Sequence, residues 1–507
     1  MLSIFDQGPP PPCPAPFNLA AYVLRAAPER AEHPALVIPG PTDDTLWSYS
    51  AVEAAVRGIA TGLLRAGFTP GDMLLMRLGN TIDFPLAFLG AIAAGLVPIP
   101  TSAQLTQHEV ERIITELSPA AVIRAPGIAS GSHPREIQLS ELIDMRHLPP
   151  ADYALGEPDR IAYVVYTSGT GGRPRAVAHA HRAIWARRMM IRDWYDLGPQ
   201  DRLLHAGAFN WTFTLGTGIM DPLSVGATAI IPDPTVPLES LPRILKRTEA
   251  TIFAAVPGAY RKILKAPDLP SLPRLRHGLA AGEKLSEEIC KEWMQRVGTR
   301  IYEAFGMSEC STFISAAPHR PAMGNALGTP QSGRRVAILA PDGPAPLGEE
   351  GIIAIHRDDP GLMLGYLNAA EETSARFQAD WFLTGDRGIM EESGQIRYMG
   401  RNDDMMNAGG FRVSPLEVEK AFAEVDGLRQ FAVCEVEVKP DVRIIVGFFS
   451  GREDVTEARL QAFAETELAE YKRPKIYYRL AEFPTNPNGK LLRRALPDLF
   501  RATQTKD

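Results

Sequence analysis

The sequence has few cysteines and lacks the usual signals for export or membrane insertion. Its four cysteines are far apart and form no C-x-x-C pair, which excludes a disulfide scaffold or a zinc ribbon and favours a reduced, cytoplasmic protein. The N-terminus lacks the basic start and apolar run of a signal peptide. The most apolar segment, residues 84–100, has 17 residues including Pro85, Gly95 and Pro98, whereas a membrane span needs roughly 20. We therefore expect no membrane span here, but a buried helix that closes at Gly95 before a short buried strand.

An excess of positive charge is also missing. With 53 Lys and Arg against 60 Asp and Glu, the formal net charge is −7, which argues against a nucleic-acid-binding surface. Hydrophobic residues make up 45% and charged residues 22% of the chain, as in ordinary globular proteins. Since 507 residues are too many for one core, we expect two or more domains. These counts leave the oligomeric state open between a monomer and a homodimer.

The order of apolar runs predicts an α/β fold. From about residue 45 to residue 330, strand-like runs alternate with helical patterns such as residues 238–249 and 286–297, which indicates layered α/β subdomains with largely parallel sheets. From there to about residue 400, short strands and tight turns indicate a β-rich subdomain. A compact α+β tail follows, with helices near 415–425 and 455–470. We expect a large N-terminal domain of residues 1–402 and a small, mobile C-terminal domain of residues 403–507.

A loop rich in glycine and hydroxyl groups follows the strand-like run 161–166. Its sequence, TSGTGGRPR at residues 167–175, combines backbone N–H groups that glycine can turn inward with side-chain donors and positive charge. Such a loop suits anionic oxygens. It matches neither G-x-x-x-x-G-K-[ST], because Pro174 stands five residues after Gly169, nor G-x-G-x-x-G. Taken alone, the loop leaves open a phosphate site of another class or a plain strand-to-helix turn.

Further stretches carry candidate functional groups. Glu309 follows an aromatic residue and a glycine in YEAFGMSEC, Asp386 stands at an expected strand end in WFLTGDRG, and Lys490 lies on a loop in PTNPNGKLLRR. Each alone could be a surface acid, a turn cap or an exposed lysine. Together with the loop at 167–175 and the stretch GRNDDMMNAGGFRVSPLEVE at 400–419, in this order, they resemble the class I adenylate-forming superfamily over essentially the whole chain. That superfamily includes acyl-CoA synthetases, peptide-synthetase adenylation domains and luciferases.

The resemblance implies a two-step reaction and assigns residues to it. ATP converts a carboxylate to an acyl-AMP with release of pyrophosphate, and a thiol then displaces AMP. The catalytic residues it implies are Lys490, which bridges the substrate carboxylate and the α-phosphate, Glu309, which holds Mg²⁺, and Arg401. Phe305 would stack on adenine, and Asp386 would accept both ribose hydroxyls, helped by Arg401. The remaining ATP or AMP contacts implied are Thr167, Ser168, Gly169, Thr170, Gly171, Gly172, Arg175, Gly282, Glu283, Glu303, Gly306 and Ser308.

The sequence departs from the family pattern at a few positions. Gly171 replaces a usual Thr, Arg175 a Lys, Ala176 a Gly, and Ser308 a Thr. Arginine keeps the positive charge of lysine but presents it as a planar fork, so the loop geometry is expected to differ while no essential charge is lost. By the same resemblance, Asp403 is the hinge about which the C-terminal domain rotates between the two half-reactions.

Coenzyme A is the expected acceptor. Tyr471, Arg473 and Lys475 alternate, and on an extended segment they would share one face that suits an adenine ring and a 3′-phosphate; a solvated basic strand is the alternative. These residues resemble the CoA site of benzoate-type ligases. So does the pair Gly409 and Gly410, which is expected to line the tunnel for the thiol.

The acyl pocket is expected in residues 206–220 and 277–285. Phe209 and Trp211 supply aromatic bulk, and Ala281 and Gly282 leave room beside it, although ordinary core packing would equally explain Trp211. The first stretch has no Arg or Lys to bind a second carboxylate. We therefore favour an aromatic, benzoate-type acid or a short- to medium-chain acid.

Other functional classes fit the sequence less well. A serine hydrolase would need G-x-S-x-G, and the nearest stretch, GMSEC, fails at Cys310. A zinc enzyme could use His179 and His181, but no third ligand has supporting spacing. A catalytically silent nucleotide-binding relative should have lost Lys490, Asp386 or Glu309, and all are present. We expect an AMP-forming acyl-CoA synthetase that uses ATP, Mg²⁺, CoA and a small carboxylic acid; a non-CoA acceptor remains an alternative.

Overall fold

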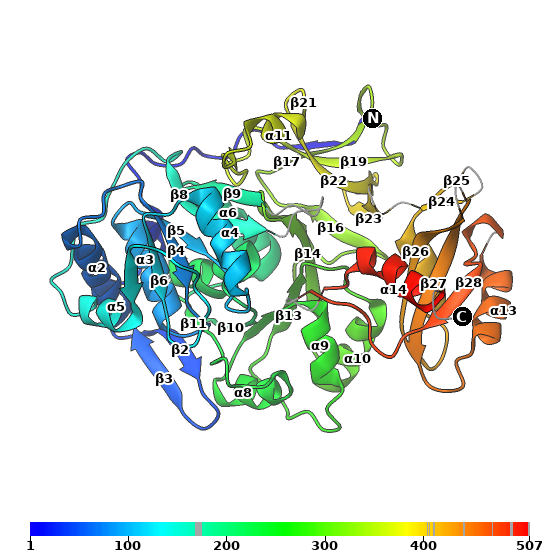
Figure 1. Cartoon of the computed structure of the whole chain (residues 1–507), viewed down its shortest axis with the longest axis horizontal. Helices are drawn as coiled ribbons and strands as arrows, with labels where there is room; N and C mark the ends of the chain where they lie inside the picture. Colours follow the sequence, from blue (N-terminus) through cyan, green and yellow to red (C-terminus); the bar gives the residue numbers. More distant parts are fainter. Residues whose placement is uncertain are drawn as a thin grey trace. The chain divides into compact units, whose positions relative to one another are not determined.

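The chain forms two compact units (Figure 1). The computed structural model describes residues 1–167, 175–402, 404, 406–408, 411–439, 442–468, 470–486 and 490–504. The larger unit contains Phe5–Val336 and Ile355–Phe382, and the smaller unit contains Met1–Ile4, Ala337–Ala354 and Leu383–Asp507. The predicted α/β class is confirmed. The predicted domain boundary at residues 402 and 403 falls inside the smaller unit and stays a prediction, because Asp403 lies outside the described residues.

The main sheet of the larger unit is parallel at its centre. Neighbouring strands run parallel from β2 through β11, β10, β12 and β13 to β14, while β3, β15 and β16 add antiparallel strands at the two sides. This arrangement confirms the largely parallel sheet expected from the alternating pattern. The strands are β2 (Pro34–Pro39), β3 (Asp44–Ser48), β10 (Arg202–Ala206), β11 (Thr228–Ile230), β12 (Ile252–Ala255), β13 (His277–Ala281), β14 (Ile301–Met307), β15 (Ser311–Ser315) and β16 (Ala326–Pro330).

Helices cover both faces of this sheet, as a parallel sheet with two apolar faces requires. One face packs on α8 (Leu241–Arg247), α9 (Pro257–Leu264) and α10 (Glu287–Val297). The other packs on the end of α6 (Ala183–Met190), on η1 (Ile191–Tyr195) and on Phe213, the residue before η2 (Thr214–Met220). The α10 helix starts where the Ser286 side chain accepts the Ile289 N–H and ends at Gly298, which has φ 81°. Both helices expected from sequence periodicity, at 238–249 and 286–297, are confirmed to within a few residues.

A second parallel sheet and a small third sheet complete the larger unit. The second has the order β5–β4–β6–β7, and the fully buried α3 (Asp83–Ala93) is followed by Gly95 at φ 78° and by the buried β5, which confirms the expected helix and strand. Within the described residues, we find no helix long and apolar enough to cross a membrane. The elements are β4 (Met73–Arg77), β5 (Val97–Pro100), β6 (Ala121–Arg124), β7 (Glu136–Gln138), β8 (Ile161–Thr167), β9 (Arg175–Ala180), β20 (Gly365–Tyr366), β21 (Phe377–Gln378), α1 (Leu19–Val23), α2 (Tyr49–Arg65), α3, α4 (Gln107–Leu117), α5 (Leu139–Met145), α7 (Asp221–Ser224), α11 (Ala370–Ala375) and η3 (Leu238–Ser240).

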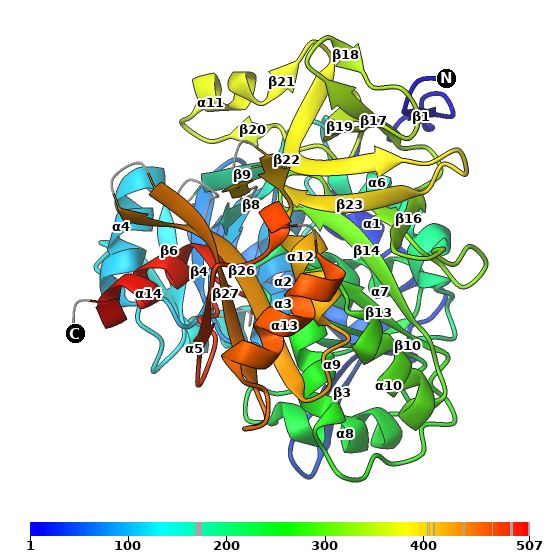
Figure 2. The same cartoon turned by 90° about the vertical axis from the view of Figure 1, so that its right-hand side faces the viewer.

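The smaller unit contains a hairpin-rich part and a compact tail. In the tail, β26 and β27 alternate their side chains between two cores: Val433 and Ile445 pack with α12 and α13, while Cys434 and Val446 pack with α14. The two strands and the three helices are labelled in Figure 2. The helices expected near 415–425 and 455–470 are confirmed as α12 and α13. The elements are β1 (Ile4–Asp6), β17 (Arg335–Ala340), β18 (Gly343–Pro344), β19 (Glu350–His356), β22 (Trp381–Met390), β23 (Ile396–Arg401), β24 (Met406–Ala408), β25 (Phe411–Val413), α12 (Pro415–Phe422), β26 (Leu428–Lys439), β27 (Val442–Gly451), α13 (Glu457–Glu467), η4 (Glu470–Lys472), β28 (Ile476–Arg479), η5 (Arg493–Ala495) and α14 (Leu496–Gln504).

Candidate active site

The half-buried Glu309 lies in the tight turn between the antiparallel strands β14 and β15. Gly306 allows this approach, because a Cβ there would lie 2.2 Å from the carbonyl oxygen of Ser311. The Tyr366 hydroxyl donates to Glu309 Oε1 at 2.6 Å, and among the described residues no hydrogen bond or ion pair is made to Oε2. Burial and the neighbouring carboxylate raise the pKa of Tyr366, so the phenol remains a donor.

A metal ion bound by Glu309 would need further ligands from outside the protein side chains described here. In the part of the chain that the structure describes, no three His, Cys, Asp or Glu side chains cluster as a metal site. Mg²⁺ is commonly held by one or two carboxylates together with substrate phosphate oxygens. Glu309 therefore fits Mg²⁺ that arrives with ATP. The zinc alternative gains no support: the His179 ring stacks on Tyr163 with centroids 4.8 Å apart, and His181 Nδ1 accepts the Leu19 N–H.

The predicted phosphate loop lies mostly outside the described residues, which include none of Ser168, Gly169, Thr170, Gly171 and Gly172. Its two ends are described. Thr167 ends β8 and Arg175 begins β9, and the two residues are paired in the antiparallel register. The loop is therefore closed by a β-hairpin, and the helix of a strand-to-helix turn does not follow it. Arg175 forms an ion pair with Glu372 of α11.

Glu303 on β14 is a predicted nucleotide contact, and in the structure it binds residues that follow β13. Glu303, which is 9% exposed, binds Lys284 Nζ at 2.6 Å and accepts the Leu285 N–H at 2.9 Å. It thus holds the turn after β13, where Gly282 and Glu283 lie; burial raises the pKa of Glu303 and Lys284 opposes that shift.

The half-buried Phe305 meets Phe313 edge-to-face, with centroids 5.4 Å apart. The next predicted contacts, Gly306 and Ser308, lie at the end of β14 and in the turn that carries Glu309. The adenine-stacking role of Phe305 stays a prediction.

Part of the predicted acyl pocket is brought together. A Cβ on Gly282, whose φ is 94°, would lie 3.1 Å from the Trp211 ring, so the indole covers this glycine. Trp211 Nε1 donates to Thr214 Oγ1 at 2.6 Å, and Ala281 packs in the same apolar cluster. Phe209 packs in another core cluster, where its ring stacks on Phe84 with centroids 4.8 Å apart. The pocket roles of Phe209, Trp211, Ala281 and Gly282 stay predictions.

Asp386 lies on β22, where its register partner on β23 is Arg401. Arg401 Nη1 is 3.7 Å from Asp386 Oδ2, and the Tyr398 hydroxyl donates to Oδ1 at 2.8 Å. Burial and this carboxylate raise the pKa of Tyr398. The expectation that Asp386 stands at a strand end is wrong, because β22 continues to Met390.

Lys490 is exposed, and its backbone is hydrogen-bonded to Asn486. Its N–H donates to Asn486 Oδ1 at 2.9 Å, and its carbonyl accepts the Asn486 N–H at 2.8 Å. The side chain is thus presented from a fixed backbone position. Gly409, Gly410 and Asp403, predicted for the CoA tunnel and the hinge, lie outside the described residues.

The segment predicted to bind CoA is not fully extended. Glu470–Lys472 form a 3₁₀-helix, so the expectation that the whole segment is extended is wrong at its start, and the alternation argument, which holds only in a strand, does not apply there. Arg473 donates to the carbonyls of Leu468 and Glu465 at 2.7 and 3.0 Å, just after and within the last turn of α13. Lys475 is exposed. Their CoA role stays a prediction.

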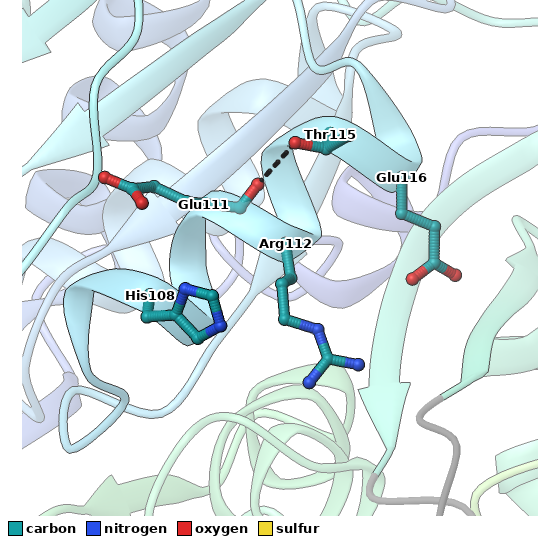
Figure 3. Close-up of a pocket in the computed structure, with 5 residues that line it drawn as sticks. All are labelled: His108, Glu111, Arg112, Thr115 and Glu116. Carbon is teal, nitrogen blue, oxygen red and sulfur yellow. Dashed lines mark hydrogen bonds between the residues drawn. The ribbon is translucent and has the colours of Figure 1, made fainter.

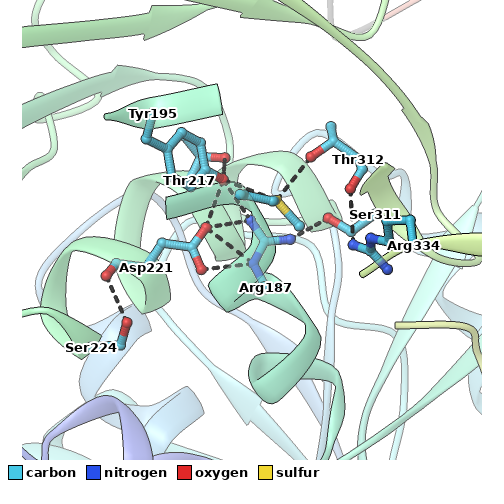
Figure 4. Close-up of polar contacts among 9 residues, drawn as sticks. Arg187, Tyr195, Thr217, Asp221, Ser224, Ser311, Thr312 and Arg334 are labelled. Carbon is cyan, nitrogen blue, oxygen red and sulfur yellow. Dashed lines mark hydrogen bonds and ion pairs between the residues drawn. The ribbon is translucent and has the colours of Figure 1, made fainter. Parts of the chain in front are cut away.

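A buried ion pair contacts Ser311, the first residue of β15 after the turn that carries Glu309 (Figure 4). Arg187 Nε donates to Asp221 Oδ1 at 2.8 Å, and the two side chains are 4% and 1% exposed. The Tyr195 hydroxyl donates to Asp221 Oδ2 at 2.7 Å, and Arg187 also donates to the Ser311 hydroxyl. Asp221 raises the pKa of Arg187 against the effect of burial, so the guanidinium stays charged. The network joins α6 and α7 to the start of β15.

The helix α4 carries a surface pocket (Figure 3). It begins with a capping box, in which Thr106 and Glu109 bind each other's backbone N–H groups. The pocket lining mixes positive and negative side chains, and Glu116 accepts a hydrogen bond from the Tyr166 hydroxyl at 2.6 Å. The lining residues are His108, Glu111, Arg112, Thr115 and Glu116.

Known proteins resemble this chain over almost its full length. Benzoate–CoA ligase of Thauera aromatica is 29% identical over 486 residues, which covers 89% of this chain and 90% of that enzyme. A 3-hydroxybenzoate–CoA/4-hydroxybenzoate–CoA ligase of the same organism is 27% identical over 507 residues, covering 90% and 92%.

Solved structures share the fold. A benzoate CoA ligase from Burkholderia xenovorans has a TM-score of 0.84 at 27% identity, covering 95% of this chain and 100% of that one. An anthranilate CoA ligase in complex with anthranoyl-AMP has the same fold, with a TM-score of 0.87 at 23% identity, covering 97% and 99%. These matches confirm a large N-terminal domain and a small C-terminal domain. The model of the AMP-binding enzyme family matches residues 23–367, and that of the AMP-binding enzyme C-terminal domain matches residues 417–490. The chain belongs to the AMP-binding enzyme family.

Proposed function

We propose that this chain is an AMP-forming acid–thiol ligase that converts a benzoate-type carboxylic acid to its CoA thioester. The observation that carries the proposal is the match to benzoate–CoA ligase of Thauera aromatica across about nine-tenths of both chains, together with family matches to both domains. The reaction consumes ATP and releases AMP and pyrophosphate. A short- or medium-chain acid is the second candidate substrate class, and CoA is the proposed acceptor.

The residues of the chain divide the first half-reaction between them. Glu309 would hold Mg²⁺ bound with ATP, and that ion would neutralise charge on the phosphate oxygens. Asp386, held by Tyr398 and Arg401, would bind the ribose hydroxyls. Lys490 would offset negative charge between the substrate carboxylate and the α-phosphate as the new bond forms.

The proposed acyl site favours a flat ring over a charged substituent. Trp211 lies against Gly282, where a Cβ would come within 3.1 Å of the indole ring. Aromatic rings pack well against one another in offset or edge-to-face geometry. These features support an aromatic acid, as do the benzoate and hydroxybenzoate relatives.

ATP–pyrophosphate exchange with a panel of acids tests the proposal. We expect exchange with benzoate or a substituted benzoate to exceed exchange with butyrate, hexanoate or a dicarboxylate, and a thioester to form when CoA is added. Exchange without thioester formation would point to another acceptor. Absence of exchange with every acid would favour a catalytically silent nucleotide-binding relative.

A further inference from the structure

A short segment of the larger unit connects the predicted metal ligand to the strand that leaves the phosphate loop. We call this segment, residues 363–373, the brace. Its Met363 N–H donates to the Glu309 carbonyl at 2.6 Å, and its Leu364 N–H donates to the Ala178 carbonyl at 2.8 Å. Within the brace, β20 pairs with β9, the strand that starts at the end of the loop. The brace therefore contacts both of the elements expected to surround the ATP phosphates.

Tyr366 is held in place by the brace itself. Its backbone N–H donates to Thr373 Oγ1 at 3.0 Å, and Thr373 Oγ1 in turn donates to the Ala369 carbonyl at 3.0 Å. Gly365, at φ 152°, would bring a Cβ within 3.3 Å of Thr373. These contacts fix where the phenol ring leaves the backbone. From there its hydroxyl reaches Glu309 Oε1 at 2.6 Å.

The Tyr366 hydroxyl binds one oxygen of the Glu309 carboxylate, which is also the predicted metal ligand. A carboxylate that binds a metal is usually oriented by an outer hydrogen-bond partner, because the bond fixes the rotation of the group and the direction of its remaining lone pairs. The Tyr366 bond uses Oε1 and leaves Oε2. We propose that Tyr366 is a positioning residue that orients Glu309 for a divalent cation bound with ATP. This inference rests on the proposed function, since Glu309 is a metal ligand only if ATP is bound as Mg·ATP.

A purely structural role predicts a different result. If the bond only stabilised the turn, its loss would weaken binding of ATP with and without metal to the same extent. If it orients Glu309, only the metal-dependent part of ATP affinity falls. Loss of an outer partner typically lowers metal affinity by about 10- to 100-fold. We expect a loss of about tenfold, because Mg²⁺ keeps most of its ligands from phosphate and water.

The test compares ATP binding by calorimetry in Mg²⁺ and in EDTA. Tyr366→Phe removes only the hydroxyl, so we expect Mg·ATP to bind about tenfold more weakly and metal-free ATP to bind as in the wild type. Tyr153→Phe is the matched control. It removes a hydroxyl that donates at 3.1 Å to Glu53, a residue of α2, and it should leave the affinities for Mg·ATP and for metal-free ATP unchanged. In a Glu309→Gln background, Tyr366→Phe should add nothing further.

Several outcomes would overturn the inference. They are an unchanged ratio of the two affinities in Tyr366→Phe, an equal loss with and without metal, and wild-type binding that does not depend on Mg²⁺. If Tyr366→Phe fails to fold, Thr373→Ala, which removes the acceptor of the Tyr366 N–H, should weaken Mg·ATP in the same direction. The binding ratio is independent of turnover. A wild type that shows the Mg²⁺ dependence but no pyrophosphate exchange with any acid would refute the ligase and leave the role of Tyr366 standing.

Discussion

Asp386 and Arg401 are register partners on two antiparallel strands, with Arg401 Nη1 3.7 Å from Asp386 Oδ2. The Tyr398 hydroxyl holds the other carboxylate oxygen at 2.8 Å. Asp386 is 5% exposed, and these two side chains contact both of its carboxylate oxygens. A carboxylate oriented in this way suits a pair of neighbouring hydroxyls, because it accepts hydrogen bonds without donating any.

Removing the charge of Asp386 should weaken nucleotide binding. In Asp386→Asn the amide keeps the shape but loses charge-assisted hydrogen bonds, which are worth about 1.5–3 kcal/mol each. We expect the affinities for ATP and AMP to fall at least tenfold in titration calorimetry. Glu350→Gln is the control, since it disrupts an ion pair with Arg387, the residue next to Asp386 on β22. Equal losses in both variants would mean that the strand pair, and no ribose contact, sets the affinity.

Removing the charge of Glu309 should change the Mg²⁺ dependence of adenylation. Glu309→Gln keeps the side-chain length and can still accept from Tyr366, but an amide is a poor ligand for Mg²⁺ in place of a carboxylate. Pyrophosphate exchange should fall steeply at low Mg²⁺ and recover in part at high Mg²⁺. Exchange that is unchanged at low Mg²⁺ would remove Glu309 from the metal site.

The sequence predicted the candidate site residues that stand in short motifs. It did not predict the distant residues whose side chains hydrogen-bond to them. Glu309, Asp386 and Lys490 stand in short stretches with a recognisable order. Tyr366 contacts Glu309 from 57 positions away, and such a contact has no local pattern. The same holds for Arg187, which reaches Ser311 across 124 positions.

The errors came from local ambiguity. Thr384, Gly385 and Asp386 have the composition of a turn, but tertiary pairing keeps them in β22, with Gly385 at φ 80°. Residues 470–475 alternate as a strand would, but the first three form a 3₁₀-helix. In both places the wider sheet and helix contacts decide the conformation, and a short window of sequence does not contain them.

Buried histidines should make the fold acid-sensitive. Burial lowers the pKa of His179, His181 and His205 to about 3, whereas an unfolded histidine has a pKa of about 6.5. Between these values the unfolded chain binds more protons, so the free energy of unfolding falls as the pH falls. At pH 5.5 each histidine should lower the free energy of unfolding by about 1.4 kcal/mol relative to its value at high pH.

Thermal unfolding between pH 7.5 and 5.0 measures this effect. The wild-type midpoint should fall steadily below pH 6.5. In His205→Leu the fall should be shallower, while His108→Asn, at an exposed position on α4, should follow the wild type. A midpoint that does not change over this range would contradict the burial of these rings as neutral groups.

A side chain at position 410 should separate the two half-reactions. If Gly410 lines the tunnel for the thiol, as the sequence predicts, Gly410→Leu would obstruct pantetheine without reaching the phosphates. Pyrophosphate exchange should persist while thioester formation falls at least a hundredfold. If Gly410→Leu makes thioester at the wild-type rate, CoA does not pass through this tunnel. Ala408→Gly, at the end of β24, is the control for an unspecific effect of a substitution near this position.

Lys490 should be needed for the first half-reaction only. Its side chain is exposed and its backbone is hydrogen-bonded to Asn486, and in the adenylating arrangement the side chain would face the charge shared by the substrate carboxylate and the α-phosphate. Lys490→Ala should lose about 3 kcal/mol of electrostatic stabilisation, comparable to an oxyanion-hole donor, and so reduce acyl-AMP formation by about a hundredfold or more.

Once acyl-AMP exists, the C-terminal domain is expected to rotate and carry this lysine away. The same variant, supplied with acyl-AMP and CoA, should therefore form thioester at nearly the wild-type rate. Lys475→Ala, assigned to CoA, should show the reverse pattern. If Lys490→Ala slowed both steps equally, a rotation between two working arrangements would be wrong for this protein, since a lysine that leaves the site after adenylation cannot affect the transfer.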